Sequence, residues 1–306
     1  MPDKRQALSD NAARQLATTT KTPPQMQAIT PRWLVKMMQW MPVEAGTLRI
    51  NRVKETAPVE VVCGSKGEQT LPETFVDYEE KPKELTLSMI STVLGVHTRV
   101  SDIFNNPMDQ VKEQLRLAVE VVKERQEDEL INNITYGLLN QAAGTMRVSP
   151  RKGPPTPDDM DELIAKVWKE PAFFLAHPRA VAAFGRECTR RGVPPPTVNL
   201  FGSPFLTWRG LPIVPCDKLH VKGKADEGKT NILLMRVGKE KQGVVGMYQP
   251  GLQGEQTPGL SVRFMGINQD AVATYLITLY CSAAVLTDDA LGVLEGVEVG
   301  NYHEYK

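Results

Sequence analysis

The segment at residues 46–95 constrains the fold more than any other part of the sequence. Its apolar residues alternate with polar ones on both sides of a highly charged stretch at 73–84: Leu48, Ile50, Val59, Val61, Leu85, Leu87 and Met89. This period of two predicts a long β-hairpin with a charged, exposed tip. A two-stranded hairpin has little core of its own, so another domain or another chain has to cover it.

A long helix is predicted after this hairpin. Asn106, Pro107 and Asp109 are typical of a helix start, because Asn caps the helix, Pro fits its first turn and Asp suits the positive end of its dipole. Apolar residues then recur at helical spacing up to about Asn133: Met108, Val111, Leu115, Ala118, Val119 and Val122. A helix of about 40 Å beside a long hairpin indicates an extended molecule.

Residues 1–30 are too polar to fold alone. They are rich in Thr and Gln, carry more Lys and Arg than Asp and Glu, and include Pro23 and Pro24. We therefore expect an extended arm that becomes ordered on a partner. The apolar and aromatic cluster at 33–40 follows the arm, and we expect it to anchor the arm in a core.

The second half is predicted to be a mixed α/β domain behind a Pro- and Gly-rich linker at 147–157. Helices are expected at 158–169 and 178–190, with a loop at 192–196. The expected strands are 173–176, 206–216, 232–237 and 260–286. Within the last of these, residues 271–287 carry no charge, but they are too few and too rich in Thr and Tyr for a membrane-spanning helix. We expect a buried strand there, no spanning segment and, from the polar N-terminus, no secretory signal.

The charge balance excludes one class of function. The 36 Lys and Arg residues equal the 36 Asp and Glu residues, so the net charge is zero. A dedicated nucleic-acid-binding protein needs a positive surplus to neutralise phosphates, and we expect no nucleic-acid partner. A net charge of zero also does little to keep copies of a chain apart, so self-association is permitted.

Residues 223–230 (GKADEGKT) match the phosphate-binding pattern G-x-x-x-x-G-K-[ST], with Gly223, Lys229 and Thr230 at its ends. The pattern binds phosphate only where a helix follows the loop, whereas residues 231–237 read as a strand. Asp226 and Glu227 would also bring negative charge to the phosphate. We interpret the segment as an exposed turn, and a nucleotide-binding enzyme that uses this loop is the alternative function.

No other group of residues indicates catalysis or a metal site. The four cysteines lack the spacing of a zinc site or a disulfide framework and are interpreted as reduced thiols: Cys63, Cys188, Cys216 and Cys281. His177 and Cys188 would lie about 16 Å apart along one helix, too far for a nucleophile and its base. The acidic residues at 158–162 are interpreted as helix-capping groups. The other histidines are scattered: His97, His220 and His303. We therefore predict no catalytic residue, metal or cofactor.

Two sets of residues resemble known families. Residues 208–217 (WRGLPIVPCD) resemble the "Gly-x-Pro-Val, then Asp" strand of tailed-phage major capsid proteins. The order of arm, long hairpin, long helix and α/β domain also resembles that of their Hong Kong 97 type fold. Residues 17–26, 29–34 and 275–299 resemble the family 2, type A encapsulins, and the similarity covers essentially the whole chain. No inserted cyclic-nucleotide-binding domain is present, which distinguishes this type from its sister type.

The resemblance implies an α+β capsid fold in four parts. These are an N-terminal arm and anchor (1–45), an extended β-hairpin loop (46–95) and a peripheral domain with a spine helix (96–146). The fourth is an axial α/β domain (147–306) with strands that return to the peripheral domain.

The resemblance also implies a function. The chain would be a cytoplasmic shell subunit without catalysis of its own, and about 60 copies (T = 1) would close into an icosahedral nanocompartment. The implied cargo is a cysteine desulfurase, in sulfur metabolism or storage. A peripheral membrane-associated antigen that uses the cluster at 33–40 is the remaining alternative.

Two sets of residues are candidates for roles in such a shell. The order of elements places the loop after the helix at 178–190 at a five-fold pore, with these candidate residues: Thr189, Arg190, Arg191, Gly192 and Val193. A ring of arginines would favour anions. The candidates for contacts between subunits lie in the arm: Thr18, Thr19, Thr20, Pro23, Pro24 and Met26.

Overall fold

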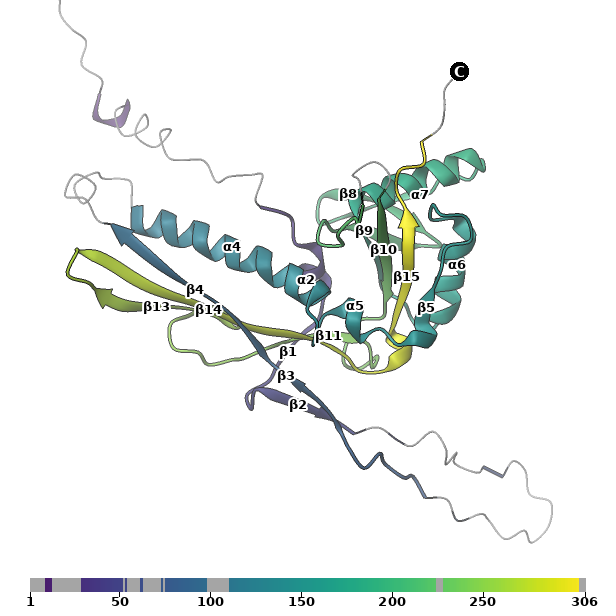
Figure 1. The fold of residues 1–306 in the computed structure, drawn as a ribbon, viewed down its shortest axis with the longest axis horizontal. Helices are drawn as coiled ribbons and strands as arrows, with labels where there is room; N and C mark the ends of the chain where they lie inside the picture. Colours follow the sequence, from purple (N-terminus) through teal and green to yellow (C-terminus); the bar gives the residue numbers. More distant parts are fainter. Residues whose placement is uncertain are drawn as a thin grey trace, which may run out of the picture.

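The molecule is elongated, with a long sheet and helix at one side and a compact α/β half at the other (Figure 1). The computed structural model describes residues 9–12, 29–51, 53, 61–62, 73, 75–97, 110–223 and 228–302. The hairpin of β2 (Thr47–Ile50) and β3 (Lys83–Thr86) projects from the junction of the two halves. This shape agrees with the extended molecule predicted from the long helix and hairpin.

The long sheet is built around β14 (Val272–Val285), the strand predicted from the uncharged segment. Within the described residues the sheet has six strands, and its main path runs β1-β11-β14-β13-β12. The bounds are β1 (Trp40–Pro42), β11 (Val244–Tyr248), β13 (Leu260–Ile267) and β12 (Glu255–Thr257). The sixth strand, β4 (Ser88–His97), pairs antiparallel with β14 along its whole length. β14 is largely buried, which confirms the prediction of a buried strand.

Helix α4 (Gln110–Asn132) lies along β4, β13 and β14 (Figure 1). Val119 and Val122 of α4 pack against Ile277, Leu279 and Cys281 of β14. Of the apolar residues predicted at helical spacing, Leu115, Ala118, Val119 and Val122 therefore face the sheet, as expected for an amphipathic helix, whereas Met108 lies outside the described residues. The predicted helix start at 106–109 lies outside the described residues.

The compact half contains a seven-stranded sheet within the described residues, in the order β5-β15-β10-β6-β9-β8-β7. The sheet is mixed: β6 pairs parallel with β9 and antiparallel with β10. The strand bounds are β5 (Arg147–Val148), β6 (Phe173–Ala176), β7 (Thr197–Leu200), β8 (Ser203–Trp208), β9 (Leu211–Pro215), β10 (Lys229–Met235) and β15 (Leu291–Glu298). Two short 3-10 turns complete it, η1 (Gly144–Met146) and η2 (Asp288–Ala290).

Both faces of this sheet are covered, and β6 shows how. Phe174 and Ala176 point to one face, where α6 (Pro157–Lys166) and α7 (Pro178–Arg190) pack. Phe173 and Leu175 point to the other face, which is covered by α2 (Trp33–Met37), the end of α4 and α5 (Leu138–Gln141). A strand buried on both faces reads as a continuous apolar run, which is why the sequence predicted it with the correct bounds.

Helix starts in this half follow local capping chemistry. The Thr156 side chain accepts a hydrogen bond from the Asp159 backbone N–H, and the Asp159 carboxylate accepts one from the Thr156 backbone N–H, which forms a capping box for α6. His177 caps α7, because its Nδ1 accepts a hydrogen bond from the Arg179 backbone N–H. The capping role predicted for the acidic segment is confirmed at Asp159, whereas Asp161 binds Trp208 and Arg209 instead.

Several strand predictions need correction. The strand expected at 206–216 is two strands, β8 and β9, joined by a tight turn at Arg209 and Gly210, which both have positive φ. The strand expected at 260–286 is also two, β13 and β14, and strands β7, β11 and β12 were not predicted. Residues 88–95 do not belong to the hairpin: its described pairing is β2 with β3 and a bridge between Val53 and Tyr78, whereas β4 pairs with β14.

Candidate assembly interface

The hairpin exposes large apolar side chains that no part of the described subunit covers. Phe75 is 78% exposed and Tyr78 is 56% exposed. The other exposed apolar residues of this segment are Val53, Val61, Val62 and Val76. The base of the hairpin is fixed by the β2–β3 pairing and by an ion pair of 2.8 Å between Arg49 and Glu84. Such apolar side chains on a projecting hairpin are typical of a protein–protein interface.

The arm joins the folded subunit at the carboxylates of α4. The Thr30 backbone N–H and hydroxyl both donate hydrogen bonds to the Glu124 carboxylate, at 2.8 to 3.0 Å. The Arg32 guanidinium donates to Glu120 at 2.6 Å and to Glu124 at 3.4 Å. The predicted contact residues of the arm lie outside the described residues: Thr18, Thr19, Thr20, Pro23, Pro24 and Met26.

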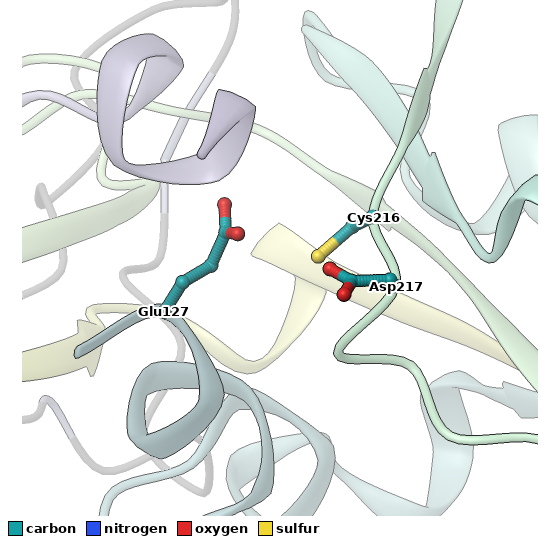
Figure 2. Close-up of side chains that lie close together, drawn as sticks. All are labelled: Glu127, Cys216 and Asp217. Atoms are coloured by element: carbon teal, nitrogen blue, oxygen red, sulfur yellow. The ribbon is translucent and has the colours of Figure 1, made fainter. Parts of the chain in front are cut away.

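A cluster of two buried side chains and one exposed carboxylate lies beside this attachment. Glu127 of α4 points toward Cys216 and Asp217 at the end of β9, and the ligand atoms of the three side chains lie within 4.8 Å of one another (Figure 2). Glu127 is 1% exposed and Cys216 is 4% exposed. Burial raises the pKa of the Glu127 carboxyl to about 7, although the Leu34 N–H, which donates to it at 3.1 Å, acts in the opposite direction. Sequence reasoning missed this cluster, because Glu127 is remote in sequence from the other two and belongs to no motif.

The cluster does not fit a metal centre well. The Lys218 ammonium already lies 2.9 Å from Asp217 and 3.1 Å from Glu124, so the local negative charge has a cationic partner within the chain. Burial also raises the pKa of the Cys216 thiol above its usual range, so the sulfur is protonated at neutral pH. Protein zinc sites use four ligands or three with an open position, and they favour several thiolates or imidazoles. We assign the cluster to the packing of α2 against α4 and β9.

The proposed pore residues lie at the end of α7 and in the turn that follows. Arg190 and Arg191 both form ion pairs with carboxylates of their own chain there. Arg190 pairs with Glu187 at 2.6 Å, and Arg191 lies 3.3 Å from Asp158 and 3.9 Å from Glu187. The neighbouring Gly192 has a φ of 71°, which glycine adopts at low cost. The remaining two candidates flank these residues: Thr189, whose hydroxyl donates to the Gly185 carbonyl, and Val193, which is half exposed.

The segment at 223–230 is not built as a phosphate-binding loop. Strand β10 begins at Lys229, directly after it, and Lys222 forms a β-bridge with Lys229. The Lys229 ammonium lies 3.3 Å from Glu298. Residues 224–227 lie outside the described residues. A strand in place of the helix removes the dipole and the row of N–H groups that phosphate binding requires, so the predicted strand after this segment is confirmed, while the turn itself lies outside the described residues.

The described cysteines are buried thiols without disulfide bonds: Cys188, Cys216 and Cys281. Burial raises the pKa of Cys188 to about 11 and that of Cys281 to about 12. Nucleophilic chemistry needs a thiolate, so these two thiols are inert at neutral pH. Cys63 and His303 lie outside the described residues.

The apolar cluster at 33–40 is part of the core. Trp33, Leu34 and Met38 are buried among residues of α4, α5 and the seven-stranded sheet. The prediction that this cluster packs into a core is confirmed for these residues. Among the described residues, no helix is long and apolar enough to span a bilayer.

A polar cavity of about 320 Å³ lies between the end of α4, α5 and strands β5, β10 and β15. Its arginine, Arg147, is already bound to Glu295 and to the carbonyls of Leu139 and Ala142. The cavity also includes His220, which lies 3.2 Å from Asp128. These three charged groups, Arg147, Glu295 and His220, therefore already have partners within the chain.

Comparison with known proteins points to one family. The family described as "Type 2A encapsulin shell protein SrpI-like" matches residues 45–301. The type 2A encapsulin shell protein SrpI of Synechococcus elongatus is 62% identical over 300 residues, which cover 98% of this chain and 97% of that protein. The type 2A encapsulin shell protein of Mycolicibacterium paratuberculosis is 59% identical over 303 residues, with the same coverage of both chains.

Solved structures agree with this relationship. A chain of the holo-SrpI encapsulin complex of Synechococcus elongatus matches with a TM-score of 0.85 and 59% identity, over 98% of this chain and 100% of that chain. The capsid of a native GTA particle matches with a TM-score of 0.59 and 11% identity, over 95% of this chain and 100% of that chain. The second likeness shows the fold alone: the predicted α+β fold of the phage capsid type is confirmed.

Proposed function

This chain belongs to the SrpI-like family of type 2A encapsulin shell proteins, and from that premise we propose that about 60 copies close into an icosahedral (T = 1) shell. As a member of this family it forms a nanocompartment with copies of itself. We further propose that the shell encloses a cysteine desulfurase in the cytoplasm, in sulfur metabolism or storage, and that the subunit has no catalysis of its own.

The exposed hairpin is the observation that supports a closed shell most directly. Its apolar side chains have no cover within the described subunit, and the arm leaves the subunit at a different point, beside α4. An interface between two different surfaces of the same chain continues from copy to copy until the rotation closes. A closed shell is the arrangement in which every copy of the hairpin and of the arm finds a neighbour.

The four parts of the subunit receive roles in this proposal. Residues 1–45 are the arm and its anchor, and residues 46–95 include the loop that reaches a neighbour. Residues 96–146 form the peripheral part with the spine helix α4. Residues 147–306 form the axial part, which brings the end of α7 to the five-fold axis as a pore. Arg190 and Arg191 face carboxylates of their own chain, so this pore would carry less positive charge than its two arginines alone supply.

The size and contents of the native particle test this proposal. We expect size-exclusion chromatography of the full chain to give a single peak of roughly 2 MDa, the mass of about 60 copies. Negative-stain microscopy should show round particles of one diameter. A sharp monomer or dimer peak at micromolar concentration would contradict the shell.

For the cargo, we expect mass spectrometry of particles from the native host to identify a cysteine desulfurase. Protection of that enzyme from added protease would show that it is enclosed.

The nucleotide-binding alternative has its own test. We expect no binding of a fluorescent ATP analogue to purified particles, in the presence or absence of Mg²⁺. A saturable signal that is lost in Lys229→Ala would favour the enzyme function instead.

A further inference from the structure

Three glutamates of α4 form a row that holds the root of the arm. Glu120, Glu124 and Glu127 follow one another at spacings of four and three residues, so they lie on one face of the helix. Together they bind Thr30, Arg32 and Leu34, which lie about ninety residues earlier in the chain. The row therefore contacts each second residue of the segment that connects the arm to the core.

The backbone of this connecting segment needs external support. Arg32 is the N-cap residue of α2 and adopts a left-handed conformation, with φ 49° and ψ 55°, and no side chain caps the helix. A residue with a side chain rarely adopts this conformation unless surrounding contacts hold it. The ion pairs of the Arg32 guanidinium with Glu120 and Glu124 supply such contacts, and the Arg32 side chain is 18% exposed.

Glu127 differs from the other two glutamates. Glu124 has the ammonium of Lys218 as a partner and Glu120 has Arg32, but among the described residues Glu127 forms no ion pair. The groups that face it are the Leu34 N–H from α2, and Cys216, Asp217 and Lys218 from the end of β9, with Glu124 on its own helix. A protonated Glu127 suits this buried position, because its carbonyl oxygen can accept from Leu34 without a buried charge.

We propose that Glu120, Glu124 and Glu127 are positioning residues for assembly: they fix where the arm leaves the subunit, and Glu127 loosens this anchor as the pH rises toward neutrality. The inference rests on the proposed function, in which the arm connects neighbouring subunits. The anchor is intact in mild acid, where Glu127 is protonated, and it is weaker where Glu127 carries a charge that burial disfavours.

The direction follows from proton linkage. Burial raises the pKa of Glu127 from 4.5 to about 7 in the closed anchor, and an opened anchor exposes the group to water. The closed state therefore binds more protons than the open state between these two values. Opening becomes more favourable as the pH rises through this window and levels off above pH 7.

Hydrogen exchange of the assembled full-length protein tests the anchor. The readout is the exchange of the backbone amides in the peptide that covers α2, between pH 5 and pH 8, corrected for intrinsic rates. The reference is Glu127→Gln, which keeps an acceptor for the Leu34 N–H but cannot ionise. We expect the opening equilibrium of the wild type, relative to this variant, to rise roughly tenfold per pH unit from pH 5 toward pH 7 and then to flatten.

Two further variants separate positioning from general stability. We expect Glu124→Gln to raise exchange of the α2 amides at every pH while the pH trend remains, because it weakens the bonds to Thr30 and Lys218 but leaves Glu127 in place. Glu113→Gln removes a carboxylate from the same helix at a pair with Arg116, and we expect exchange of α2 as in the wild type. An identical pH trend in the wild type and Glu127→Gln would overturn the switch, and unchanged exchange in Glu124→Gln would overturn the anchor.

The assembly state is measured on the same samples by size-exclusion chromatography. If the protein forms no particles, the proposed shell fails, but the exchange of α2 in free subunits still reports whether the anchor exists. If particles form and α2 shows no difference among the variants, the shell stands and the positioning role is wrong. We expect Glu124→Gln to require a higher protein concentration for assembly than Glu113→Gln, since only the former carries a displaced arm.

Discussion

The guanidinium of Arg236 lies buried against Asp289, with Nη2 at 2.8 Å from Oδ1. Arg236 follows the end of β10, and Asp289 belongs to η2, just before β15. The same guanidinium donates to the Thr287 hydroxyl at 2.8 Å and to the Lys169 carbonyl at 3.2 Å. The Arg236 side chain thus connects the loop before β6 with β10 and β15, which are neighbours in the seven-stranded sheet.

We predict that Asp289→Asn destabilises the subunit by about 3 kcal/mol, since removal of one partner leaves the other charge buried and unpaired. The thermal midpoint of the particle, measured at fixed protein concentration, should fall by several degrees. Glu170→Gln is the matched control, because its pair with Lys241 is exposed and contributes little. Equal midpoints for the two variants would contradict a structural role for the buried pair.

The same pair predicts acid sensitivity. Burial opposes ionisation of Asp289, but hydrogen bonds from Arg236 and Lys169 outweigh it and hold the pKa of that carboxyl below its usual value. A group with a lowered pKa contributes stability above its unfolded pKa of 3.8 and loses it as the pH falls further. The thermal midpoint of the wild type should therefore fall more steeply below pH 4 than that of Asp289→Asn. Parallel curves would show that another carboxyl controls acid unfolding.

The hairpin prediction concerns assembly rather than folding. We expect Phe75→Ser combined with Tyr78→Ser to leave the subunit folded, because both side chains are exposed within it. Burial of a large apolar side chain at an interface contributes about 2 kcal/mol, so the double variant should assemble only at much higher concentration. The fraction of protein in the particle peak is the measurement. Phe75→Leu retains most of the apolar surface and serves as the control; wild-type assembly by the double variant would exclude the hairpin from the interface.

Local signals explain which parts of the fold could be predicted from the sequence. The bounds of β6 and α7 were correct, because an apolar run, a Pro and a capping His177 lie within a few residues of one another. The break between β8 and β9 was missed although Gly210 offered a signal, since a tight turn needs positive φ and glycine adopts it readily.

Pairings between distant segments could not be read from the sequence. β4 continues the alternating pattern of the hairpin, and only its partner β14, far along the chain, assigns it to another sheet. Glu127 has the same difficulty, because nothing near it in sequence distinguishes it from the exposed acids of α4. The fold that brings it to Cys216 is what makes it unusual. Resemblance to a family could predict the overall fold and the shell, but not this contact.

The pore prediction depends on a carboxylate that sequence reasoning did not consider. Glu187 faces both Arg190 and Arg191, so it neutralises part of the charge of the proposed ring. We expect Glu187→Gln to increase the entry of iodide into the particle by roughly tenfold, measured by quenching of a fluorophore attached inside the shell. Replacement of Arg190 and Arg191 by Ala should lower iodide entry. Equal rates in all three proteins would place this loop away from the pore.

Buried thiols give a final test of the described core. At pH 7.5 the thiolate fraction of Cys188 is minute, because its pKa is about 11, and Cys281 lies higher still at about 12. In a Cys63→Ser background, we expect Ellman's reagent to label almost no thiol in the native particle and all of the remaining ones in concentrated urea, which unfolds the chain. Rapid and stoichiometric labelling of these thiols in the native particle would contradict their burial and show that the core around them is open to water.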